Sequence, residues 1–99
     1  MKTVKEIIEE LSQLLGIEST ERIKKDGIIE KIFLIDGITD TIQIGRKLRD
    51  FFEKRNLEMI GFDPTAFGIW IYPKSIIGVT ITRHQNSVWV GLCFYLCEA

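Results

Sequence analysis

The side chains of this chain that could carry chemistry are few and lie far apart in the sequence. The one histidine, His84, stands beside a predicted turn, where a histidine is more often a surface residue than a general base. Asp36, Asp40 and Asp63 stand at the ends of predicted elements, where aspartates usually form turns and caps rather than metal sites or acid–base pairs. No nucleophile-elbow motif and no glycine-rich phosphate loop occurs. We therefore expect no catalytic residues and no enzyme activity.

Two cysteines near the carboxyl end have the spacing of a pair of zinc ligands. Cys93 and Cys97 are four positions apart, which on a strand separates them by roughly 13 Å, too far for a disulfide or a shared metal. We expect buried thiols, no metal site and no cofactor.

The sequence predicts a cytoplasmic location. Its first residues already follow the pattern of an amphipathic helix and do not form an export signal. The longest apolar run, Val88 to Cys97, is too short to span a bilayer, and no membrane association is expected.

Charge gives little reason to expect a nucleic-acid partner. The formal net charge is −1. Most basic residues of a cluster between positions 46 and 55 can form ion pairs on a helix, because acidic residues stand four positions away. The pairs are Arg46–Asp50, Arg49–Glu53 and Asp50–Lys54. These charges are typical of a solvated helix face rather than of a phosphate-binding patch.

Two amphipathic helices are predicted from the spacing of apolar residues. The first covers residues 3–15, where Thr3 and Glu6 fit a capping box and Gly16 is placed to end the helix. The second runs from Asp40 to about residue 55. Gly45 inside it lowers the stability of the helix by about 1 kcal/mol relative to alanine, which suggests that another segment packs closely there.

The remaining segments read as strands. Residues 20–25 and 28–35 are predicted to form a hairpin around Asp26-Gly27, with a short helix over 20–25 as the alternative. Further strands are predicted over 57–62, 66–72, 76–82 and 88–96, and the alternative for the last is a helix over 87–98. The order α-β-β-α-β-β-β-β predicts a single α+β domain over residues 1–99, with two layers: an antiparallel sheet and two helices on one face.

The last three strands separate their residues sharply between two faces. We pair Tyr72 with Ile76 and His84 with Ser87, which leaves hairpin loops of three and two residues. One face then consists only of large hydrophobes, in the rows Phe67–Ile81–Val90, Ile69–Val79–Leu92 and Ile71–Ile77–Phe94. This face is the predicted core.

The opposite face gathers the aromatic residues and glycines. Trp70, Tyr72, Trp89 and Tyr95 are the expected anchors for a partner, because Trp and Tyr bury large areas with few rotatable bonds. The row Gly68–Thr80–Gly91 is expected to form a shallow trough between the two tryptophans, with Trp70 lying over Gly78.

Such a face suggests binding rather than catalysis. Monomers rarely leave a large apolar patch in water, so we expect the face to be covered. The preferred hypothesis is a non-catalytic protein-interaction module, acting as a homodimer or as a small adaptor or inhibitor of a larger protein. The alternative is binding of a flat ligand, a nucleotide or single-stranded nucleic acid by stacking on the same face. The chain covering the face itself is a further alternative, with one helix on each side of the sheet or with the segment Leu57–Phe62 folded across it. The least favoured hypothesis is an enzyme that uses His84 with an aspartate.

Overall fold

The architecture comes from a computed structural model of residues 1–99. The structure describes residues 3–23, 27–37, 39–61, 63–71 and 75–95. Among these residues, neither helix is long and apolar enough to cross a membrane.

Two helices form where the caps predict them. Helix α1 spans Val4–Leu15, and the reciprocal hydrogen bonds of Thr3 and Glu6 at its start complete the capping box. It ends at Gly16, whose φ of 71° lies in the left-handed region that favours glycine. Helix α2 spans Thr41–Lys54, and the Asp40 side chain accepts a hydrogen bond from the Gln43 amide at its start.

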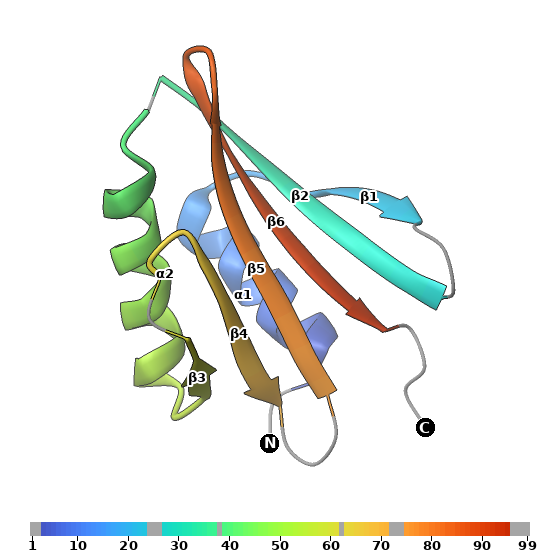
Figure 1. Ribbon diagram of the computed structural model, residues 1–99. Helices are drawn as coiled ribbons and strands as arrows, with labels where there is room; N and C mark the ends of the chain where they lie inside the picture. Colours follow the sequence, from blue (N-terminus) through green and yellow to red (C-terminus); the bar gives the residue numbers. More distant parts are fainter. Residues whose placement is uncertain (1–2, 24–26, 38, 62, 72–74, 96–99) are drawn as a thin grey trace.

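All six strands join one antiparallel sheet in the order β1-β2-β6-β5-β4-β3 (Figure 1). The strands are β1 (Thr20–Ile23), β2 (Ile28–Asp36), β3 (Glu58–Ile60), β4 (Ala66–Ile71), β5 (Ser75–His84) and β6 (Ser87–Tyr95). The predicted α+β fold is confirmed. The two helical alternatives are wrong for the described residues, because 20–23 and 87–95 are strands.

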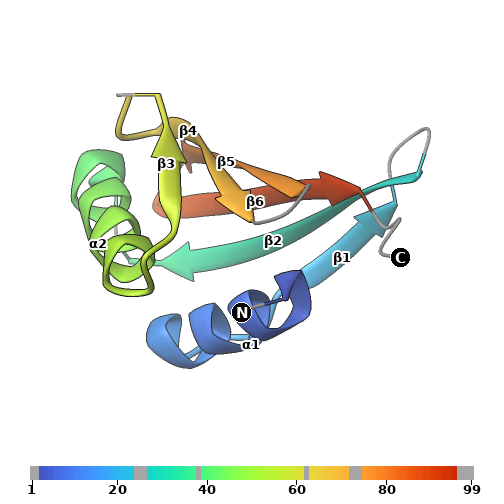
Figure 2. The same cartoon turned by 90° about the horizontal axis from the view of Figure 1, so that it is seen from below.

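The core lies between the sheet and both helices. Its helical side is formed by Val4, Ile7, Ile8 and Leu11 of α1 and by Ile44, Leu48, Phe51 and Phe52 of α2. The sheet side includes eight of the nine predicted core residues as buried side chains, and the ninth, Phe94, packs against them half-buried. Figure 1 looks onto the opposite face with α1 behind the sheet, and Figure 2 shows α1 beneath β2.

Both edges of the sheet are short. Strand β1 has four residues, all exposed, and two of them, Glu21 and Arg22, are charged. Strand β3 has three residues and begins with Glu58. Short, charged edge strands are poor templates for pairing with another chain.

One hairpin register was predicted correctly and the other was not. Strands β5 and β6 pair His84 with Ser87, Thr82 with Trp89 and so on, as expected. Strands β4 and β5 pair Ile76 with Trp70, whereas the predicted partner of Ile76 was two residues further along, so the predicted β4 rows are displaced by two residues. A shift of two residues leaves every side chain on the same face, so hydrophobic alternation does not distinguish these registers.

Candidate functional site

The sheet face opposite the helices, which we call the open face, carries large apolar side chains. Five of them are exposed: Leu34, Ile60, Ile76, Trp89 and Tyr95. Three more are half-buried: Ile28, Ile32 and Trp70. Both helices pack on the other face, and the segment 58–60 forms edge strand β3 instead of crossing the sheet. No described element therefore covers the open face, which answers the possibility that a helix or this segment does so.

Most of the predicted partner-binding residues share this face. Alternation and register place Trp70, Trp89 and Tyr95 there, together with Gly68, Thr80 and Gly91. Tyr72 lies outside the described residues.

The predicted trough has a different composition. Gly68 pairs with Gly78 rather than Thr80, so one row of the face is Gly68–Gly78–Cys93. The neighbouring row is Ala66–Thr80–Gly91. The expected contact of Trp70 with Gly78 is wrong, because the register places Trp70 in the row of Ile76.

Side chains already fill much of this low region. A Cβ atom at Gly91 would lie 3.1 Å from the Thr80 hydroxyl and 3.2 Å from Glu30 Oε2. At Gly68 it would lie 3.6 Å from atoms of both Ile60 and Ile76.

Gly78 differs from these two glycines. The nearest described atom to a Cβ built there is the Cys93 carbonyl oxygen, at 4.0 Å. We call this bare stretch of backbone the Gly78 hollow. Cys93 and Gly68 flank it across the strands, and Thr80 and Ile76 flank it along β5.

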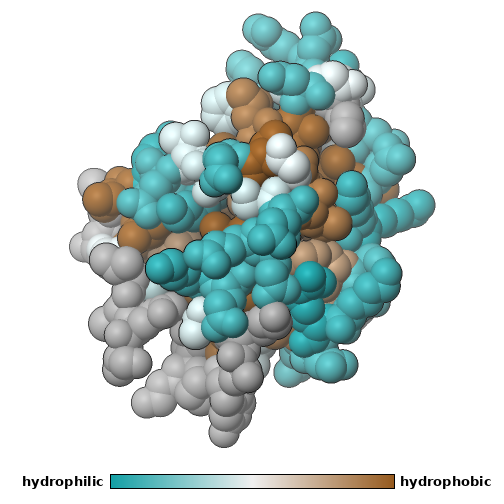
Figure 3. All heavy atoms as spheres, turned by 180° about the vertical axis from the view of Figure 1, so that it is seen from behind, coloured by the Kyte–Doolittle hydropathy of each residue, from teal (hydrophilic) through white to brown (hydrophobic). Residues whose placement is uncertain are grey.

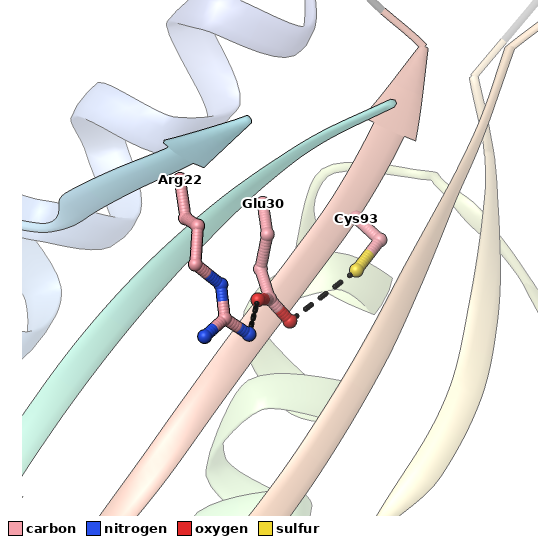
Figure 4. A network of polar contacts seen from close by, with 3 residues as sticks. All are labelled: Arg22, Glu30 and Cys93. Atoms are coloured by element: carbon pink, nitrogen blue, oxygen red, sulfur yellow. Dashed lines mark hydrogen bonds and ion pairs between the residues drawn. The ribbon is translucent and has the colours of Figure 1, made fainter. Parts of the chain in front are cut away.

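A buried carboxylate lies beside the hollow. Glu30 is only 7% exposed, and its Oε1 accepts a hydrogen bond from Arg22 Nη2 at 2.6 Å (Figure 4). The Cys93 thiol donates to Oε2 at 3.5 Å. These residues come from β1, β2 and β6, which the sheet brings into one row. Their assembly depends on the pairing of β2 with β6, which local sequence does not reveal.

His84 lies against a tryptophan rather than in a catalytic group. Its ring is 5.4 Å from that of Trp89, tilted by 56°. Within the described residues, no group of three or more His, Cys, Asp or Glu side chains is placed to hold a metal ion.

Two of the three aspartates at element ends, Asp40 and Asp63, act in a cap and a turn. Asp40 caps α2. Asp63 Oδ1 accepts hydrogen bonds from the Thr65 amide at 2.9 Å and from its hydroxyl at 2.8 Å. These two bonds, the backbone one first, lower the pKa of Asp63 below its ordinary 3.8.

Three basic residues in and after α2, Arg49, Lys54 and Arg55, contact other groups of the molecule, and only one of them does so as predicted. Lys54 pairs with Asp50 at 2.9 Å, as expected. Arg49 instead donates to the Gly61 carbonyl at 3.2 Å and lies over the Phe67 ring. Arg55 bridges the two helices through an ion pair with Glu10 at 2.7 Å.

The helical side of the molecule has a different surface. Hydrophilic residues dominate it, with hydrophobic residues showing between them (Figure 3). A groove of about 650 Å³ opens on this side between α1 and the strands β1, β2 and β6, lined by Val4, Lys5, Ile8, Glu9, Ser12, Gln13, Glu18, Ser19, Glu21, Ile29, Lys31, Phe94 and Tyr95. The ion pair between Lys31 and Glu21, at 2.9 Å, lies on its wall.

Comparisons with protein families, curated proteins and solved structures give no match for this chain.

Proposed function

We propose that this chain is a non-catalytic protein-interaction module that works in the cytoplasm and binds a protein surface through its open face. The observation that carries the proposal is the composition of that face. An antiparallel sheet with one solvated face usually alternates apolar residues inside with polar residues outside. Here β2 places Ile28, Ile32 and Leu34 outward, although both helices lie on the other side.

The aromatic residues on this face support the same conclusion. Trp89 and Tyr95 are 38% and 63% exposed, and side chains of these types dominate the energetics of protein interfaces. The extent of the face also fits. The six strands contain 41 residues, and at about 3.4 Å by 4.8 Å for each residue the sheet has an area on the order of 650 Å². A standard interface buries about 800 Å² per partner.

Photo-crosslinking tests the proposal. A photoreactive amino acid replaces Thr82, an exposed residue beside Trp89 on the open face, and the matched control replaces Glu53 on the exposed side of α2. In cells, position 82 should give discrete protein adducts that position 53 does not give. Adding Leu34→Arg to the position-82 variant should remove them, because it places a charge in the same apolar surface.

Two results would count against a protein-binding face. Labelling that is the same from positions 82 and 53 would show that the open face has no preferred contact. Position-82 adducts that nuclease treatment digests would assign the face to single-stranded nucleic acid instead.

A further inference from the structure

The open face has the properties of a surface that pairs with itself, and we propose that its partner is a second copy of this chain, with Trp89 of each copy inserted into the Gly78 hollow of the other. This inference rests on the proposed function, because it names the occupant of the same face. It starts from shape. A dimer with twofold symmetry uses the same patch twice, so every protrusion must meet a depression that belongs to the same patch.

Both parts of such a contact are present on neighbouring strands. Trp89 on β6 is a large exposed side chain, and Gly78 on β5 is bare backbone, where an added Cβ would have no described side-chain atom within 4 Å. Thr82 faces Trp89 and Cys93 faces Gly78, so the two positions are four residues apart along the strands.

The geometry of this contact agrees with known sheet packing. Four residues at about 3.4 Å and one strand spacing of about 4.8 Å separate Trp89 from Gly78 by roughly 14 Å, along a line about 20° from the strands. A twofold axis that lies between the two faces and exchanges these positions crosses the strands of the two copies at about 40°. Aligned sheet sandwiches cross at about 30°.

Charge also favours a second copy. The charged residues in the middle rows of the open face, Arg22 and Glu30, neutralise each other within one chain at 2.6 Å. The other acidic residues of the face, Asp36 and Glu58, stand in its outer rows. Two identical faces can therefore approach without bringing an unpaired charge into the centre, where it would be costly.

The test uses two variants with complementary shapes. Trp89→Ala removes the protrusion, and Gly78→Val fills the hollow at a position with room for a side chain. Sedimentation equilibrium of the wild type should give twice the chain mass of 11.4 kDa. Each variant alone should dimerise about 30-fold or more weakly, as expected for the loss of an interface hot spot.

Mixing the two variants should restore dimers. In a mixed dimer one contact places Trp89 over an unchanged Gly78, and the other places the new alanine of one chain against the new valine of its partner, so neither contact clashes. Circular dichroism checks that each variant is folded. If Trp89→Ala or Gly78→Val is unfolded, the milder pair Trp89→Leu and Gly78→Ala replaces them. This pair should also show weaker dimers alone and restored dimers on mixing, with smaller effects.

The possible failures can be told apart. A wild-type chain that stays monomeric at its solubility limit, yet crosslinks from position 82 to a different protein, overturns self-pairing and leaves the proposed function standing. A dimer that neither variant weakens lies elsewhere on the molecule and overturns self-pairing through this face. Variants that weaken the dimer but do not restore it on mixing overturn the insertion of Trp89 into the Gly78 hollow.

Discussion

Replacing Gly45 by alanine should destabilise this protein, although the same change stabilises most helices. Gly45 lies inside α2 and is buried against the turn that precedes β4. In a helix open to solvent, Gly→Ala contributes about 1 kcal/mol of stability. Here the added Cβ would lie 1.9 Å from the Pro64 carbonyl oxygen and 2.8 Å from its carbonyl carbon.

The size of the effect follows from how far the turn must move. Real Cβ contacts essentially never fall below 3.0 Å, so α2 and Pro64 must separate by at least the difference of 1.1 Å. The turn is held on both sides of Pro64. Asp63 accepts two hydrogen bonds from Thr65, and the Thr65 carbonyl accepts one from the Ile81 amide at 2.8 Å. Overpacking costs about 1–3 kcal/mol. The upper end of this range, about 3 kcal/mol, less the gain of about 1 kcal/mol in helix propensity, leaves a net loss of about 2 kcal/mol in the free energy of unfolding.

Urea unfolding at one fixed protein concentration measures this loss. Gly45→Ala should lower the midpoint at an unchanged slope, and its melting temperature should fall by about 4–8 °C for each kcal/mol lost. Arg46→Ala, at the next and exposed position of α2, is the matched control and should stay within about 0.5 kcal/mol of wild type. A Gly45→Ala variant as stable as wild type, or more stable, would refute the close approach of Pro64.

Three further changes probe other parts of the structure. Thr3→Ala removes the capping box of α1 and should lower the stability measured by thermal unfolding by about 1 kcal/mol. Lys5→Ala, on the exposed side of the first turn, is the control and should change the stability little. Equal effects of the two changes would contradict the cap. Phe52→Ala empties a fully buried site and should cost about 3–5 kcal/mol in urea unfolding, and a loss below 1 kcal/mol would place this ring outside the core. Asp63 should titrate by NMR below its ordinary pKa of 3.8, so its contribution to stability is present above pH 3.8 and is lost as the pH falls through the folded-state pKa. Thr65→Ala keeps the backbone donor and removes the hydroxyl, so it should raise the pKa of Asp63 only part of the way, and no change would show that the hydroxyl bond is absent in solution.

Local rules in the sequence predicted the elements well. The capping box at Thr3, the cap at Asp40 and the end at Gly16 depend on residues within one helical turn, and the structure has all three. The β5–β6 register was also predictable, because the two-residue loop between His84 and Ser87 leaves little choice. Such features need no knowledge of distant segments.

Other features depend on distances that local patterns do not set. The β4–β5 register was wrong because both registers keep the same side chains on the same faces and leave a loop of three residues. The contact of Glu30 with Cys93 joins residues 63 positions apart and exists only because β2 pairs with β6. The Gly78 hollow is a further case, because sequence alternation places three glycines on one face without showing which neighbouring side chains cover them.

The short, charged edges of the sheet have a consequence for how large an assembly of this chain can become. Strands β1 and β3 offer four and three residues, and their charges oppose the addition of another chain at either end. Growth by strand addition is therefore disfavoured in both directions, and pairing through the open face covers the apolar side chains of that face. An association of this kind closes on itself after one step, so raising the concentration yields more pairs rather than longer fibres.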